Sequence, residues 1–115
     1  MTMQVSKDMK FSDKLALDAP IFDPSAFRLD EEQAAIITRA REIGQTVFAA
    51  RAAGYDRDAT FPTENYRDLH RVGLLGIAIP RKHGGLGAGY QTYALAAAEI
   101  GRYCGATALT WNMHV

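Results

Sequence analysis

The sequence predicts an all-α fold, a helical bundle of about four helices that is incomplete at its C-terminus. Apolar residues recur at helical spacing between residues 30 and 53. An alanine-rich stretch from 90 to 103 has the composition of a buried helix. Between them lies a glycine-rich stretch, 73–89, which reads as a folded connection. The 115 residues are enough for one domain with a modest core.

Residues 1–28 are predicted to be an N-terminal leader or arm, outside the helical domain. Pro20 and Pro24 interrupt any regular element there. The stretch has no long apolar segment of the kind found in secretory signals.

The first helix is predicted to start after Asp30, whose side chain suits an N-cap. Gln33 stands at the spacing of a capping box. The helix should run to about Ala53 and stop at Gly54. Its buried stripe contains Gly44, so we expect a neighbouring helix to approach closely there. The other residues of that stripe are Ile36, Ile37, Ala40, Ile43, Val47 and Phe48.

A polar connection over residues 55–61 should lead to a short helix that opens at Pro62 or Thr63 and ends at Gly73. Its apolar face would carry Tyr66, Leu69 and Val72. The apolar run 74–79 then reads as a buried extended segment, ended by a proline.

The third helix is predicted over about 90–103, with Ala97 and Gly101 leaving room for a close neighbour. A fourth helix should begin near Thr107 and has no stop signal before Val115. We therefore expect the chain to be the N-terminal piece of something longer, or to have an unusual early stop.

Composition narrows the class of protein. Hydrophobic residues make up 48% of the chain, which excludes a disordered class. Acidic and basic residues balance at 13 each, so no overall charge favours nucleic acid as a partner. No apolar run approaches the roughly 20 residues that a bilayer requires. With a single cysteine and no signal, the expected location is cytoplasmic.

No catalytic constellation or metal-ligand spacing stands out. His70 and His83 read as surface or loop residues, Cys104 as a packing residue, and Glu99 as a carboxylate without an evident partner. The glycine-rich stretch matches neither GxxxxGK[ST] nor GxGxxG, so a structural turn is favoured over an anion cradle. From the residues alone, any chemistry lies elsewhere.

The sequence nevertheless resembles the N-terminal helical domain of the acyl-CoA dehydrogenase family. The resemblance is carried by FPTENYRDLHRVGLLGIAIPRKHGGLGAG, residues 61–89, and by the later segment GATALTWNMHV. It covers about residues 29–115, which would form a partial domain of this kind.

The resemblance implies a flavin enzyme that contains FAD and performs α,β-dehydrogenation of an acyl-CoA thioester. The catalytic glutamate and the main FAD contacts of the family lie in other domains. This segment alone is therefore expected to be inactive and to bind no FAD. The family also implies a homo-oligomer, a dimer or a tetramer.

By position in the family, the helix after the glycine break lines the acyl pocket. Thr107 and Trp111 would face the substrate, with Thr110 and His114 possible further contacts. Trp111 is bulky and should shorten or reshape that pocket if it points inward.

Two other readings stay open. Flavin monooxygenases share the fold, and some carry a histidine on this same helix, which Trp111 to His114 would accommodate. A chain of this length could also act alone as a helical interaction module. Substrate identity, acyl chain length and the electron acceptor are not fixed by the sequence.

Overall fold

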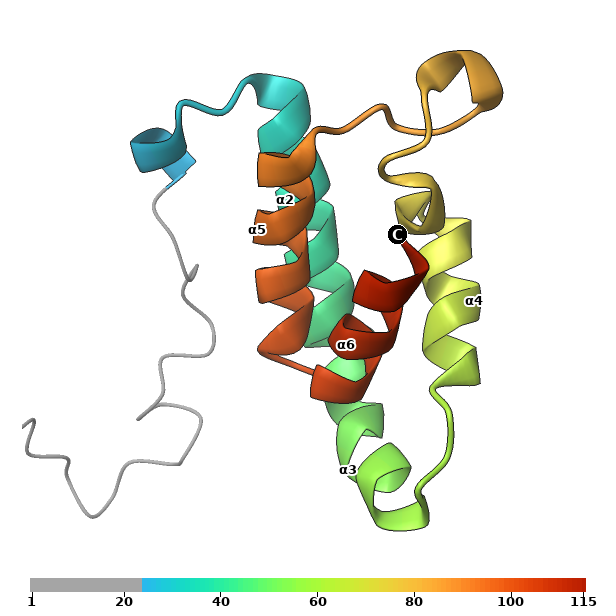
Figure 1. Ribbon diagram of the computed structural model, residues 1–115. Coiled ribbons are helices and arrows are strands. Elements are labelled where there is room, and N and C mark those ends of the chain that lie inside the picture. The colour runs from blue at the N-terminus through green and yellow to red at the C-terminus, as the bar shows by residue number, and fades with distance from the viewer. Residues whose placement is uncertain (1–23) are drawn as a thin grey trace, which may run out of the picture.

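The computed structural model describes residues 24–115, and over this range the chain is helical with no strand (Figure 1). Short 3-10 turns occupy Pro24–Phe27, Leu74–Gly76 and Arg81–His83. The longer elements are α2 Glu31–Ile43, a π-helical segment Gly44–Phe48, α3 Ala49–Asp58, α4 Thr63–Arg71, α5 Tyr90–Gly101 and α6 Gly105–His114. Residues 1–23, most of the expected leader, lie outside the described residues.

Helices α2 and α3 form one continuous rod through the π-helical segment, because Gly44 and Ala49 keep right-handed helical backbone angles. The rod starts as expected. The side chain of Asp30 accepts a 2.8 Å hydrogen bond from the backbone N–H of Gln33. The side-chain oxygen of Gln33 accepts a 2.9 Å bond from the backbone N–H of Asp30. This capping box satisfies two donors that the first turn would otherwise leave unpaired.

The predicted end of the first helix, at Ala53 with Gly54 as the stop, is wrong. The helix continues to Asp58 and ends at Ala59, whose φ of 52° is left-handed. Side chains of its last two turns bind α4, since Arg51 contacts Asn65 and Tyr55 contacts Glu64. These tertiary contacts outweigh the cost of an interior glycine, about 1 kcal/mol. The expected connection over 55–61 therefore shrinks to residues 59–62.

Helix α2 packs along α5, and Figure 1 shows the two side by side. The close approach predicted at Gly44 is confirmed. A Cβ atom added at Gly44 would lie 2.5 Å from the ring of Tyr103, which is buried just after α5. Contacts this short do not occur in real structures, so only glycine lets the aromatic ring rest on the rod.

Helix α4 runs from Thr63 to Arg71, as predicted, and Gly73 follows it. The prediction that residues 74–79 form an extended segment is wrong. It forms a 3-10 turn and further turns, with Leu74 and Ile77 buried and Ala78 and Ile79 exposed.

Backbone pairing explains this compact shape of the apolar run. The N–H of Leu86 donates to the carbonyl of Gly76, and the N–H of Ala88 donates to that of Ile77. The glycine-rich loop thus folds back onto the run. Gly85 makes this possible, because a Cβ atom there would overlap the carbonyl group of Ile79.

Helix α6 lies in front of the bundle between α5 and α4 (Figure 1). It begins at Gly105, two residues before the predicted start, with Cys104 as its N-cap. The close seam expected at Gly101 is present, since a Cβ atom there would lie 3.6 Å from the methyl group of Ala108. With the α2–α3 rod counted once, the residues from 24 onward contain four long helical elements, as expected. Their core is Ile36, Ala40, Ile43, Phe48, Leu69, Leu74, Ile77, Ala96, Ile100, Tyr103, Cys104 and Trp111.

Candidate functional site

Helix α6 carries all four residues that the sequence analysis assigned to a substrate pocket. Two of them, Thr107 and Trp111, are fully buried in this chain. They stand one turn apart, so they share the face of α6 that points into the bundle. The indole N–H of Trp111 donates a 3.1 Å hydrogen bond to the carbonyl oxygen of Leu74. This bond ties α6 to the turn that follows α4.

Thr110 and His114 lie farther out. The hydroxyl of Thr110 donates a 2.8 Å hydrogen bond to the carbonyl of Ala106 in its own helix. The ring of His114 is exposed and stands edge-on to Tyr66, with ring centres 6.4 Å apart. The structure therefore divides the four residues into a buried pair and an outer pair along one side of the helix.

A shallow groove lies next to the C-terminal end of α6. It is lined by Ala78, Ala88, Gly89, Tyr90, Tyr93, Asn112 and Val115. Its lining is mostly apolar or aromatic, and the phenol O–H of Tyr93 donates a 3.5 Å bond to the backbone carbonyl of Asn112. Burial raises the pKa of the Tyr93 phenol, and the neighbouring Tyr90 raises it further. The apolar and aromatic lining suits an uncharged, apolar group.

Trp111 packs behind Tyr93, with ring centres 5.6 Å apart. It does not line the groove itself, because its side chain is fully buried. The indole therefore packs behind the Tyr93 ring, which forms part of the groove wall.

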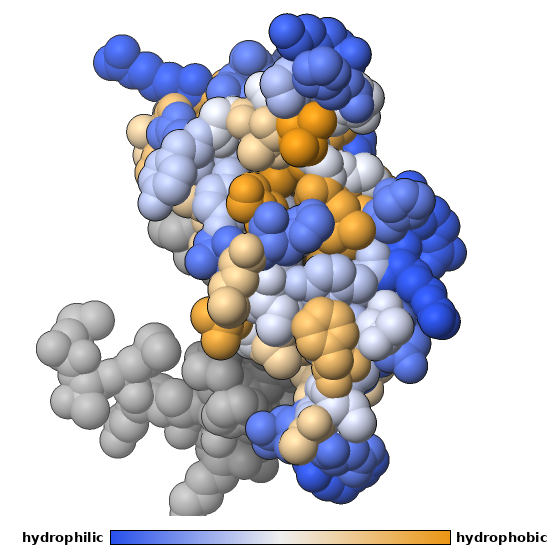
Figure 2. All heavy atoms as spheres, turned by 45° about the vertical axis from the view of Figure 1, so that its right-hand side comes forward, coloured by the Kyte–Doolittle hydropathy of each residue, from blue (hydrophilic) through white to orange (hydrophobic). Residues whose placement is uncertain are grey.

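The exposed side of α6 carries large apolar side chains as well. Leu109 and Met113 are 63% and 78% exposed, and Val115 is partly exposed. Figure 2 shows hydrophobic side chains in orange over the middle of the face that carries α4 and α6, within a hydrophilic surround.

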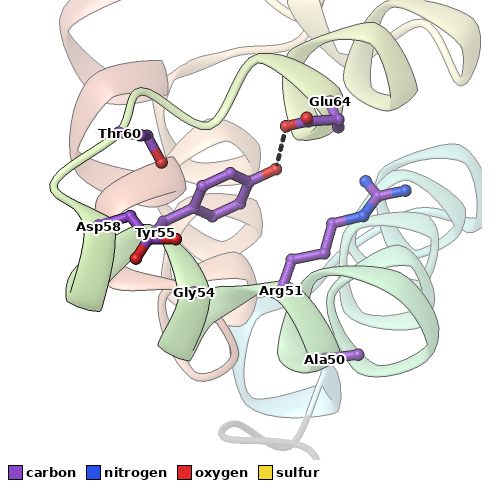
Figure 3. A pocket seen from close by; sticks show the side chains of 7 residues that line it. All are labelled: Ala50, Arg51, Gly54, Tyr55, Asp58, Thr60 and Glu64. Carbon is purple, nitrogen blue, oxygen red and sulfur yellow. Dashed lines mark hydrogen bonds between the residues drawn. The ribbon is translucent and has the colours of Figure 1, made fainter.

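A second hollow lies between α3 and the start of α4 and is polar (Figure 3). The phenol of Tyr55 donates a 2.6 Å hydrogen bond to a carboxylate oxygen of Glu64. Burial and this bond raise the pKa of Tyr55, and the same bond lowers the pKa of Glu64. Arg51 also lines this hollow. Tyr55 and Glu64 pair across this hollow, while Arg51 binds Asp68 of α4, so we assign the region to the packing of α3 against α4.

Arg51 also begins a buried polar chain that the sequence analysis missed. Its guanidinium contacts the side chains of Asn65 and Asp68 at 2.9 and 2.7 Å. The amide nitrogen of Asn65 donates a 2.8 Å bond to the hydroxyl of Thr107. That hydroxyl lies 3.1 Å from the sulfur of Cys104 and donates to it.

The buried side of α4 therefore includes polar residues. Asn65, Asp68 and Leu69 are buried, whereas Tyr66 and Val72 are only partly so. The signal in the sequence was the i, i+3, i+4 spacing of these three residues. This spacing did not indicate a buried face, because polar side chains are normally assigned to the solvent side of a helix.

The glycine-rich loop offers no anion cradle. The backbone N–H groups from Gly84 to Ala88 all donate to backbone carbonyls of residues 76–81. Arg81 pairs with Glu32 of α2, and His83 is exposed. Among residues 24–115 no cluster of side chains could hold a metal ion. None of the helices in this range combines the length and the apolar content of a membrane span.

The other residues singled out in the sequence, His70, Cys104 and Glu99, do not line the groove. His70 is exposed, and Cys104 is buried as expected. Glu99 does have a partner, contrary to expectation, because its carboxylate contacts the guanidinium of Arg102 at 3.3 Å. The partner stands three residues later, at the C-cap of α5, within reach of a side chain in the last helical turn.

Comparison with known proteins gives a consistent result. A protein-family model, described as the N-terminal domain of acyl-CoA dehydrogenase, matches residues 30–115 of the sequence. A probable acyl-CoA dehydrogenase of Bacillus subtilis (strain 168) is 32% identical over 85 residues, which is 74% of this chain and 22% of that protein. An acryloyl-CoA reductase (NADH) of Anaerotignum propionicum is 34% identical over 89 residues, 77% of this chain and 23% of that protein.

A cyclohex-1-ene-1-carbonyl-CoA dehydrogenase of Syntrophus aciditrophicus (strain SB) is 37% identical over 82 residues. The match covers 70% of this chain and 20% of that protein. The chain thus spans about a fifth to a quarter of the length of these curated relatives.

Proposed function

Because the chain belongs to the acyl-CoA dehydrogenase family, with residues 30–115 matching its N-terminal domain, we propose that it is the helical domain of a flavin-dependent oxidoreductase that acts on an acyl-CoA thioester. The reaction would be the α,β-dehydrogenation of the acyl group. The names of the relatives support redox chemistry on CoA thioesters, and they include both dehydrogenases and a reductase. The complete protein would be a cytoplasmic homo-oligomer, a dimer or a tetramer.

The apolar groove beside α6 is the observation that supports a role for this domain in substrate binding. Its aromatic and small residues would form one wall of the acyl pocket, with Tyr93 and Tyr90 against the acyl group. An apolar wall excludes water from the carbon atoms that react. The described residues supply this wall and no group suited to remove a proton there.

Trp111 and Thr107 would act on the pocket from behind this wall, since both are fully buried. Thr110 and His114 do not line this groove, and they remain predicted candidates for contact with substrate in the complete protein. Trp111 would keep the acyl group short or compact by filling the space behind Tyr93.

The glycine-rich loop does not fit the diphosphate of a flavin, because its N–H groups pair internally. Following the family resemblance, we assign the main FAD contacts and the catalytic base to other domains of the complete protein.

Anaerobic titration of the complete protein tests the proposal. An acyl-CoA should bleach the absorbance of the bound flavin without any added reductase. Flavin that dissociates readily, and turnover that needs a reductase and oxygen, would instead assign the protein to the monooxygenases of the same fold. A soluble, colourless complete protein would favour an interaction module.

A further inference from the structure

We propose that Asn65 is a positioning residue that acts through Thr107 to set where α6 lies, and thereby which acyl groups the groove accepts. The second half of this inference rests on the proposed function. The first half rests only on the buried polar chain that joins α3, α4 and α6.

The chain of hydrogen bonds has one direction. Arg51 donates to the side-chain oxygen of Asn65, which leaves the amide nitrogen of Asn65 to donate to Thr107. Thr107 in turn donates to Cys104. Asn65 is fully buried and uses both ends of its amide, so its orientation is fixed by partners on two other helices.

Arg51 anchors the outer end of this chain. Its side chain is 37% exposed where it lines the polar hollow of Figure 3, and its guanidinium also pairs with the buried carboxylate of Asp68. Arg71 contacts the same carboxylate. Two cations thus hold Asp68, and one of them, Arg51, also donates to the amide oxygen of Asn65.

Two directional contacts add to the packing of α6 on α5 and help to fix its place. Among its residues only Thr107 and Trp111 are buried, and each makes a hydrogen bond to the α4 region. The large apolar residues Leu109 and Met113 point away from the bundle. Hydrogen bonds weaken steeply when their angle or length changes, so these two bonds resist rotation and sliding of the helix.

Movement of α6 would displace residues that line the groove. Asn112 of α6 and Val115, its C-cap, line the groove, and Tyr93 of α5, which also lines it, packs on Trp111. Loss of the Asn65–Thr107 bond would therefore change the width of the groove without removing any lining residue.

The test uses the complete protein and two variants at one position. Thr107→Val keeps the size of the side chain and removes the hydroxyl, whereas Thr107→Ser keeps the hydroxyl. Thr46→Val is the matched control, because the Thr46 hydroxyl is exposed and bonds only to the carbonyl of Glu42 in its own rod. For each variant, kcat and KM are measured with acyl-CoA thioesters of increasing acyl length.

We expect Thr107→Val to change the ratio of kcat/KM between the shortest and longest accepted substrates by about threefold or more, mainly through KM. Thr107→Ser should restore the wild-type ratio. An unchanged ratio in Thr107→Val, or an equal change in Thr46→Val, would overturn the inference. If Thr107→Val does not fold, Thr107→Ala replaces it. If neither variant folds, the bond serves general stability, and the inference is overturned.

Hydrogen exchange separates this inference from the proposed function. Amides of residues 108–114 should exchange faster in Thr107→Val than in Thr107→Ser, whatever the protein catalyses. Equal exchange contradicts the positioning role. If the wild-type flavin responds to no acyl-CoA, the proposed function fails, and the claim about acyl selectivity fails with it.

Discussion

The indole N–H of Trp111 donates a hydrogen bond to the carbonyl oxygen of Leu74, and both side chains are fully buried. This contact joins α6 to the turn after α4, across 37 residues of sequence. Trp111→Phe keeps an aromatic ring but removes the indole donor, so the carbonyl keeps only the longer, 3.3 Å bond from the backbone N–H of Ile77. We expect it to lower the free energy of unfolding by about 1–3 kcal/mol. Chemical denaturation measures this, and a change below about 0.5 kcal/mol would contradict the role given to the bond.

Trp111→Ala tests the pocket. Removing the indole opens space behind Tyr93, so the complete protein should accept longer acyl groups than the wild type. The cavity should also cost about 3–5 kcal/mol of stability. A substrate profile that stays the same in a folded Trp111→Ala protein would show that the indole does not limit the pocket.

Two glycines of the same rod should respond to alanine with opposite signs. At Gly44 a methyl group would press on the ring of Tyr103, and we expect a loss of about 1–3 kcal/mol. At Gly54 the nearest atom lies 3.9 Å away, on the flexible side chain of Arg57. There alanine should stabilise the helix by about 0.4–1 kcal/mol. Thermal unfolding of both variants checks the pair, and equal signs would contradict the packing described here.

The capping box predicts a smaller effect. Asp30→Ala removes the acceptor for the N–H of Gln33 and should destabilise the protein by about 1 kcal/mol. Asp30→Asn keeps an acceptor oxygen and serves as the control. Urea denaturation compares the two, and indistinguishable midpoints would mean that the box contributes nothing measurable.

The pair of Tyr55 and Glu64 predicts two opposite dependences on pH. The pKa of Glu64 is lowered in the folded protein, chiefly by the phenol hydrogen bond. Its contribution to stability is present above the unfolded-state pKa and is lost as the pH falls through the folded pKa. The pKa of Tyr55 is raised, chiefly by burial and next by the bond to Glu64, so its contribution is lost as the pH rises through the folded pKa.

Tyr55→Phe checks this pair. It removes the phenol donor, so the pKa of the Glu64 carboxyl should move back up, as measured by NMR titration of side-chain carbons. The matched control is Tyr66→Phe, on the same helix as Glu64 but without a phenol bond to that carboxylate. A Glu64 pKa that does not change in Tyr55→Phe would show that the bond is absent in solution.

Several features of the helices followed from the sequence because they depend on neighbours in the chain. Asp30 and Gln33 stand three residues apart, and they alone create the first cap. The start of α4 at Thr63 and its end before Gly73 are equally local. The family resemblance was also carried by local motifs, and the match over residues 30–115 confirms it.

The tertiary structure decided the rest, since contacts between distant residues outweigh local preferences of about 1 kcal/mol. Gly54 does not stop its helix, because Arg51 and Tyr55 bind α4. The run 74–79 is not extended, because the glycine loop folds back and pairs with it. Asn65 is buried rather than exposed, because Thr107, 42 residues later, takes its hydrogen bond. Such a partner is visible only when the helices are packed together.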